Sequence, residues 1–513
     1  MKHHCTDHPI TKTLTPSYST LRSPSRYRLT MINHTVCKIT SSNHISGKPI
    51  FKKARPNVKL EDLPQDLLCT ILSKLPAKEV SRATILSSNW RYICAICCYK
   101  LCFAGATGCC RDTFERKEYL QYMQKFIDNV NTIVQKCRGK FLEEFHVRFE
   151  FDAMLVDPLN KWVNFAVSSR TKSIAVNLRP INKRRTDVDR YAFPFHLLDN
   201  GSNMSHLQCI QLSFVSLRPP SEFRGFPILR KLDLEFVDIA LKDLQVILSN
   251  CYNLGWLSLV RCFLNGELKL DRPLSHLRHL TVVYCRVTRI EFHVTKLVTF
   301  VYDGPIVPIF INQDSKLENA HICFDKTNFQ DGATSLLNGI PSVQNLTLKI
   351  FDQRLEKESL LNSPGKLSRL RCLQLVMGLG VEDTDKLSHV VSILRAAPLI
   401  EKLEINFSPI THICFADKGA LGKQHLQLCE YNYLKNMHMT AYKGTRGQLE
   451  FLLHVVENAP ALEELIVDTA IRDYEDQYAG LYCRKKACAE RAVQHARSCL
   501  GGKLSAKVKL CVM

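Results

Sequence analysis

The sequence predicts an α/β fold in which three short helices precede an irregular solenoid. The solenoid is expected to have a curved parallel sheet, with helices or irregular returns on its convex face. Three observations predict this fold: helical apolar spacing between residues 60 and 104, an apolar motif that recurs after residue 140, and enough chain after each copy for a return segment. A length of 513 residues with 45% hydrophobic and 23% charged residues is typical of a globular protein.

The N-terminal 58 residues are rich in Ser, Thr, His and Lys and have no hydrophobic period, which predicts a disordered tail. The net charge of +20 is concentrated at the two ends of the chain. Residues 1–59 hold eleven Lys and Arg against Asp7, and residues 484–513 hold eight against Glu490. A nucleic-acid site would concentrate its charge on a folded face, so specific nucleic-acid binding is not expected.

Three short helices are predicted between residues 60 and 104. In the first, Leu68, Ile71, Leu72 and Leu75 recur at spacings of three and four, and Pro76 ends the helix. Further helical stretches begin near residue 78 and around residue 90. A bundle this small buries little surface alone, so we expect a partner to cover its apolar face.

The same segment carries an ordered motif. It opens with Leu-Pro at 63–64, continues with Ile-Leu at 71–72 and Leu-Pro at 75–76, and closes with Leu-Ser-x-x-Trp-Arg at 86–91. It resembles the F-box. The resemblance implies docking on the Skp-type adaptor of a cullin–RING ubiquitin ligase through Leu63, Pro64, Leu67, Leu68, Ile71, Leu72, Leu75, Pro76, Val80, Leu86, Trp90 and Arg91. Plant F-boxes commonly have basic residues where this chain has Ser88 and Asn89, a departure that leaves weaker docking open.

Beyond residue 140 an apolar residue is repeatedly followed by others three and five positions later. The first members of the eleven copies are Leu142, Leu207, Leu229, Leu254, Leu277, Leu297, Val343, Leu370, Ile400, Leu434 and Leu462. This is the leucine-rich-repeat pattern, in which each copy supplies one strand and stacking buries a continuous core. Cys262 and Cys285 stand where such repeats usually have Asn. Residues 243–248 and 387–394 read as return helices; an ordinary α/β domain is the alternative.

Residues 434–465 predict a strand, a turn, a helix and a strand, and resemble the FBD motif of plant F-box proteins. Gly444 and Gly447 supply the turn, which either starts the helix or forms a small binding feature. The helix carries a predicted apolar stripe of Leu449, Leu452, Leu453 and Val456. A last helix over 487–500, ending at Gly501 and Gly502, is expected to cap the solenoid.

The predicted domains are a disordered basic tail (1–58), the F-box (59–104), a linker or helical connection (105–140), leucine-rich repeats (141–425), FBD-type terminal repeats (426–470), and a capping helix with a basic tail (471–513). No phosphate-binding loop or nucleophile elbow is recognisable. Cys94, Cys97, Cys98, Cys102, Cys109 and Cys110 raise a zinc hypothesis, but their spacing favours the last F-box helix and a linker. No cofactor or metal is expected.

The chain has no apolar run of bilayer length and no signal-peptide core. We therefore expect an intracellular protein of the nucleus, the cytoplasm or both, with mostly reduced thiols among its 22 cysteines.

The sequence is thus similar to plant F-box/leucine-rich-repeat proteins with a C-terminal FBD-type motif. The resemblance implies a non-catalytic, substrate-recognition adaptor of an SCF-type ubiquitin ligase, with an unknown protein substrate. One alternative is an F-box scaffold outside a ligase; another is a repeat enzyme or nucleic-acid binder.

Overall fold

The structure is a computed structural model. It describes residues 63–64, 67–68, 71, 100–105, 116–137, 142–180, 189–198, 206–270, 274–311, 316–324, 340, 342–350, 367–379, 384–409, 429–470 and 486–513. All of them belong to one compact unit, Asn57–Arg472 with Lys485–Met513. The predicted N-terminal tail lies outside the described residues.

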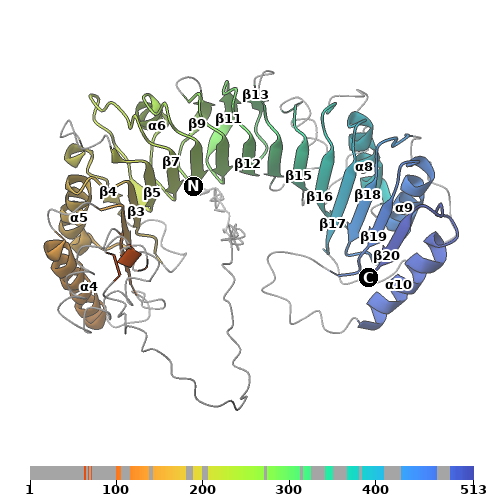
Figure 1. Ribbon diagram of the computed structural model, residues 1–513, viewed down its shortest axis with the longest axis horizontal. Helices are drawn as coiled ribbons and strands as arrows, with labels where there is room; N and C mark the ends of the chain where they lie inside the picture. Colours follow the sequence, from red (N-terminus) through yellow and green to blue (C-terminus); the bar gives the residue numbers. More distant parts are fainter. Residues whose placement is uncertain are drawn as a thin grey trace, which may run out of the picture. The chain divides into compact units, whose positions relative to one another are not determined.

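One long parallel sheet organises this unit. Its fifteen strands stand in chain order, and Figure 1 shows them side by side in a curved row. The strands are β1 (Lys100–Ala104), β2 (Glu144–Arg148), β3 (Ser173–Asn177), β5 (Cys209–Ser213), β7 (Lys231–Glu235), β8 (Trp256–Val260), β10 (His279–Val283), β12 (Thr299–Gly304), β14 (Asn319–Phe324), β15 (Asn345–Ile350), β16 (Cys372–Leu379), β17 (Lys402–Pro409), β18 (Asn436–Thr440), β19 (Glu464–Val467) and β20 (Lys509–Val512).

The recurring motif predicted eleven of these strands, and the solenoid prediction is confirmed. The motif missed β1, β3, β14 and β20. Thr171 holds the first apolar place of the β3 repeat, and Ala320 holds the second place of the β14 repeat; both are buried. A small or polar residue that is buried by its neighbours leaves no hydrophobic signal in the sequence.

Shorter elements lie between the strands. A second parallel sheet contains β9 (Gly266–Leu270), β11 (Val287–Phe292) and β13 (Ile309–Ile311), and β4 (Tyr191–Ala192) pairs with β6 (Val215–Ser216). The helices are α4 (Arg116–Lys136), α5 (Val156–Ser168), α6 (Leu241–Leu248), α8 (Thr384–Ala396), α9 (Arg446–Asn458) and α10 (Lys486–Leu500), with 3-10 turns at Ala153–Leu155 and Phe195–Leu197. The helices lie along the outer side of the row of strands (Figure 1), and their apolar residues join those of the strands in one core.

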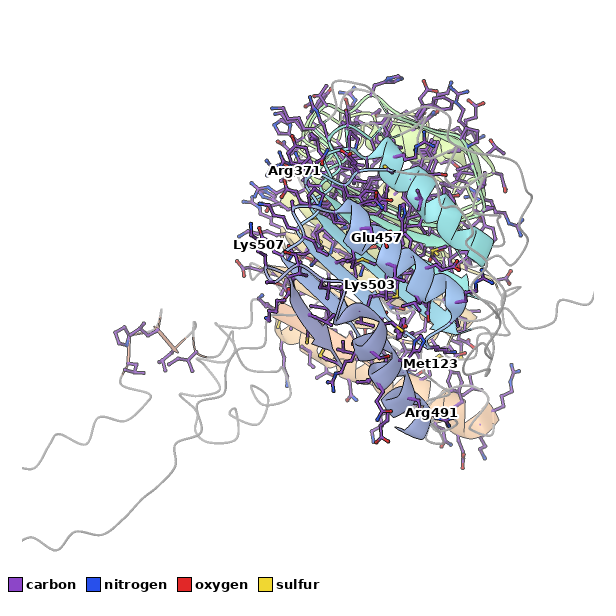
Figure 2. The ribbon with its side chains drawn as sticks, turned by 90° about the vertical axis from the view of Figure 1, so that its right-hand side faces the viewer. Met123, Arg371, Glu457, Arg491, Lys503 and Lys507 are labelled. Atoms are coloured by element: carbon purple, nitrogen blue, oxygen red, sulfur yellow. The ribbon has the colours of Figure 1, made fainter. Side chains whose placement is uncertain are left out.

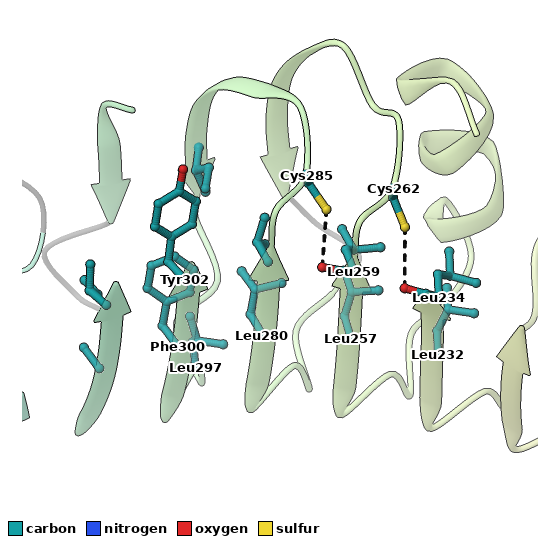
Figure 3. Close-up of a cluster of buried hydrophobic side chains, with 14 of the residues drawn as sticks. Leu232, Leu234, Leu257, Leu259, Cys262, Leu280, Cys285, Leu297, Phe300 and Tyr302 are labelled. Carbon is teal, nitrogen blue, oxygen red and sulfur yellow. Dashed lines mark hydrogen bonds between the residues drawn. The ribbon is translucent and has the colours of Figure 1, made fainter. Parts of the chain in front are cut away.

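Alternation along each strand fills that core. In β8 the side chains of Leu257 and Leu259 are fully buried, and Leu232, Leu234 and Leu280 stand beside them on β7 and β10 (Figure 3). In the turn that follows each of β8 and β10, a thiol donates a hydrogen bond to the preceding repeat. Cys262 Sγ donates to the Leu234 carbonyl oxygen at 3.5 Å, and Cys285 Sγ donates to the Leu259 carbonyl oxygen at 3.3 Å. Cysteine therefore takes the hydrogen-bonding place that the repeat pattern assigned to it.

The C-terminal end contains three neighbouring helices. Helix α8 packs on α9, and α9 packs on α10 (Figure 2). Thr445 caps α9: its hydroxyl accepts from the Gln448 amide, and the Gln448 side chain accepts from the Thr445 amide. Gly444, with φ +71°, supplies the turn before this cap. The turn at 444–447 is thus part of the helix start.

Three sequence expectations need correction here and at the start of the sheet. The fully buried face of α9 holds Phe451, Leu452 and Val455, whereas Leu449, Leu453 and Val456 of the predicted stripe are only partly buried. Residues 509–512 form strand β20 on β19 instead of continuing a basic tail. Residues 100–104 form strand β1 on β2, where an F-box helix and linker were expected. Both strands are too short to show a clear alternation of apolar and polar residues. They form because each pairs with the strand of a neighbouring repeat.

Candidate interaction sites

The described part of the F-box segment forms the start of a helix. The Leu68 amide donates to the Pro64 carbonyl oxygen at 3.1 Å, which closes the first turn. Leu68 is buried at 2% exposure, whereas Leu67 is 48% exposed and Ile71 is 39% exposed. Leu67 and Ile71 are four residues apart, so they share a helix face that differs from that of Leu68.

This exposure sorts the described F-box residues into two groups. Leu68 belongs to the interior, and Leu67 with Ile71 forms an apolar pair open to a partner; Leu63 is half-buried and Pro64 is exposed. The other F-box positions assigned from the sequence lie outside the described residues: Leu72, Leu75, Pro76, Val80, Leu86, Trp90 and Arg91.

The main sheet has one face on the core and one open face. Along each strand the open face carries the residues that flank the two buried side chains and the residue between them. At its centre Lys231, Trp256 and His279 are in register on β7, β8 and β10. The Trp256 and His279 rings stack with their centroids 3.5 Å apart and their planes 11° apart, and Lys231 Nζ lies 5.3 Å from the Trp256 ring.

This stack forms a half-buried aromatic platform. Burial, helped by the charges of His321 and Lys231, lowers the pKa of His279 to about 4. The ring is therefore neutral at physiological pH and stacks without a charge. Asp233 is the next open-face residue along β7 from Lys231, and burial raises the pKa of its carboxyl. A rigid aromatic surface with a few polar groups is typical of protein-binding sites.

The carboxyl edge of the sheet holds a cluster that no motif in the sequence predicted. Phe214, Phe236, Arg261 and Tyr284 follow β5, β7, β8 and β10 directly, and all four have positive φ. A positive φ is uncommon in residues other than glycine, and the residue types at these positions gave no reason to predict it. Its side chains pack against arginines from other repeats.

Within the described ranges no group of three His, Cys, Asp or Glu residues is placed to hold a metal. Of the cysteines in the zinc hypothesis, only Cys102 is described, and its thiol is 3.7 Å from His146 Nδ1 on the next strand. The helices that the structure describes include none long and apolar enough to cross a membrane.

Comparison with known proteins agrees with this architecture. Residues 133–513 match the family described as the At1g61320/AtMIF1 LRR domain, and residues 60–101 match the F-box domain. The Arabidopsis thaliana F-box/FBD/LRR-repeat protein At1g13570 is 22% identical, over 81% of this chain and 92% of that protein. The FBD-associated F-box protein At1g61320 of the same organism is 21% identical, over 81% of this chain and 89% of that protein.

The two matched domains are protein–protein interaction modules, and the predicted resemblance to F-box/leucine-rich-repeat proteins is confirmed. The repeat match alone covers most of the chain and includes every strand of the main sheet except β1. The chain belongs to the family of F-box proteins that carry the At1g61320/AtMIF1 leucine-rich-repeat domain.

Proposed function

We propose that this protein is the substrate-recognition adaptor of an SCF-type ubiquitin ligase. Its F-box docks on a Skp-type adaptor and thereby on a cullin–RING ligase, and its repeats hold a protein substrate. In this role the chain makes and breaks no bond itself, because it accelerates ubiquitin transfer by bringing the substrate close to the charged enzyme. The adaptor acts in the nucleus or the cytoplasm under this proposal.

The exposed pair Leu67 and Ile71 carries the docking half of the proposal. Large apolar side chains at 48% and 39% exposure on one helix face have no cover from the described part of this chain. Burying them against a partner removes apolar surface from water, which is worth about 25 cal/mol per Å². Their place inside the segment that matches the F-box points to the Skp-type adaptor as that partner.

The open sheet face supports the substrate half. It presents the Trp256 and His279 platform at its centre, and buried aromatic anchors dominate binding energy at protein interfaces. The FBD-type C-terminal segment, with α9 and α10, lies at the other end of the sheet from β1. It is a second surface that a substrate can contact.

The test is affinity capture of the full chain from cells in which the proteasome is inhibited. We expect Leu67→Ala/Ile71→Ala to lose the Skp-type adaptor and the cullin while its substrates accumulate on it. Leu399→Ala removes another exposed leucine, at 37% exposure outside the F-box, and should leave adaptor binding unchanged.

If the wild-type protein has no measurable affinity for purified Skp-type adaptor, the ligase role is wrong. The chain then acts as a scaffold outside a ligase, an alternative that the F-box departures at Ser88, Asn89 and Cys94 keep open.

A further inference from the structure

Two pairs of arginines share aromatic rings at the carboxyl edge of β3–β10. The guanidinium carbons of Arg179 and Arg261 lie 4.4 and 5.2 Å from the centre of the Phe236 ring. Those of Arg190 and Arg286 lie 5.0 and 5.3 Å from the centre of the Phe263 ring. Each ring therefore contacts two cations, which the ring stabilises, while the charge of Arg179 opposes that of Arg261.

The pairs continue into the neighbouring repeats. Arg190 also lies 5.0 Å from the Phe214 ring, and Arg261 lies 5.3 Å from the Tyr284 ring. We call the set Arg179, Arg190, Phe214, Phe236, Arg261, Phe263, Tyr284 and Arg286 the arginine–aromatic edge. It joins residues more than a hundred positions apart in the sequence.

The backbone fixes this edge. Phe236, Arg261 and Tyr284 have φ values of 53°, 54° and 48°. Their amides donate to the carbonyl oxygens of Val260, Val283 and Asp303 on the next strand, at 2.8, 2.7 and 2.6 Å. Left-handed backbone is strained in residues other than glycine, and here the hydrogen bonds to the next strand hold it at the same place in adjacent repeats. Strained backbone of this kind clusters at functional sites.

The carboxylates nearby are largely engaged. Glu235 pairs with Arg179 and Asp238 pairs with Arg218, each at 2.8 Å. Arg190 donates to the Phe236 carbonyl oxygen at 2.8 Å. No ion pair joins Arg261 or Arg286 to a carboxylate within the described ranges. Burial lowers the pKa of Arg261, and the charge of Arg179 lowers it further, while Tyr284, Glu235 and Asp303 oppose the shift.

Arg261 is half-buried and Arg286 is exposed, so both remain reachable from solvent. A guanidinium held against a ring presents its N–H groups in a planar fork, which matches a carboxylate in two parallel hydrogen bonds. An arriving anion would also offset the repulsion between Arg179 and Arg261. The edge is thus preorganised for separate anionic groups.

We propose that the arginine–aromatic edge binds an acidic segment of the protein substrate, with carboxylates seated on Arg261 and Arg286. The inference rests on the proposed function and names the class of substrate. The ends of this chain do not fit the edge, because residues 1–59 and 484–513 are strongly basic. A nucleic acid fits it less well, because its affinity comes from many phosphate contacts, whereas two of the four arginines of this edge, Arg179 and Arg190, already have partners.

The test uses the full chain and fluorescence anisotropy of a labelled twelve-residue peptide that alternates Glu and Ser. A peptide with Gln in place of Glu is the neutral reference. We expect wild type to prefer the Glu peptide, and Arg261→Gln/Arg286→Gln to weaken its binding by about tenfold or more. Arg286→Gln alone, at an exposed position, should give part of this loss without any effect on folding.

The matched control removes the same charge from the opposite edge of the sheet. Arg230 and Arg278 are exposed and directly precede β7 and β10. Arg230→Gln/Arg278→Gln should bind the Glu peptide as wild type does. An equal loss in this control, or a wild type that binds both peptides alike, overturns the proposal. So does duplex DNA of random sequence that displaces the peptide at lower concentration.

Capture of the purified Skp-type adaptor is measured on the same proteins. Normal adaptor capture by Arg261→Gln/Arg286→Gln with loss of the peptide supports the edge as the substrate site. If wild type binds the peptide but does not capture the adaptor, the arginine–aromatic edge is supported as a binding site and the ligase role is wrong. The two proposals can therefore fail independently.

Discussion

Cys262 and Cys285 show how a single residue type fits a stacked repeat. Each follows its strand by two positions, is almost fully buried, and donates its thiol to a carbonyl oxygen of the preceding repeat. A buried cysteine behaves as a small hydrophobe with a weak donor. It therefore fills the turn and adds a weak hydrogen bond to a carbonyl oxygen at the end of the neighbouring strand.

At this scale we expect Cys262→Ala to lower the free energy of unfolding by about 1–2 kcal/mol. The substitution removes the sulfur from the core together with its hydrogen bond to the Leu234 carbonyl oxygen. Urea denaturation of the full chain measures the loss. Cys102→Ala, at an exposed position on β1, is the control and should change stability by less than about 0.5 kcal/mol. Equal effects of the two substitutions would contradict this account.

Among the elements, α9 shows how the chain changes from strand to helix. After β18 the chain takes a left-handed turn at Ala441 and again at Gly444, and Thr445 then begins the helix. Gln448 is buried at 1% exposure, and its side chain accepts from the Lys443 amide at 2.8 Å. The turn and the first helical turn are thus held by the same two side chains.

We expect Thr445→Ala to destabilise the protein by about 1 kcal/mol, because the Gln448 amide loses its acceptor at the helix start. Hydrogen exchange should show the loss first in the amides of α9. Thr295→Ala, in an exposed loop, offers the same change of residue without a helix cap. Unchanged exchange rates in α9 of the Thr445 variant would rule out the cap as a stabilising feature.

For the whole molecule, buried and half-buried histidines link stability to pH. Burial lowers the pKa values of His146, His279 and His454 below the usual 6.5, that of His279 to about 4. Below pH 6.5 the unfolded chain therefore binds protons that the folded chain resists. Stability is complete above about pH 6.5 and falls as the pH is lowered toward 4. Asp233 opposes this trend, because burial raises the pKa of its carboxyl and the folded chain therefore binds that proton more readily than the unfolded chain does.

We expect the urea midpoint to fall between pH 7 and pH 5 in a fixed buffer series. His279→Phe keeps a ring on Trp256 and removes the titrating group, so it should flatten this decline. A variant with the same pH dependence as wild type would show that His279 does not contribute to it. His321 and Lys231 face His279 from β14 and β7 and are unchanged in the comparison.

The repeat architecture also explains which parts of the fold were predictable. The motif spacing located eleven strands because each buries its own leucines, as in Leu257 and Leu259. The helical spacing of apolar residues predicted the return helices α6 and α8 likewise, because each helix buries its own apolar side chains. Strands β3 and β14 were missed because Thr171 and Ala320 are buried by their neighbours and not by their own hydrophobicity.

By itself, the sequence determined the repeat pattern, the family resemblance and the exposed or buried period along each strand, since all three are encoded within a few neighbouring residues. Only the tertiary structure decided that Leu67 and Ile71 are open while Leu68 is buried, and that Arg190 contacts both Phe214 and Phe263. The reason is physical. A periodic pattern specifies which face of an element is apolar, but the register between repeats and the left-handed turns specify which side chains meet.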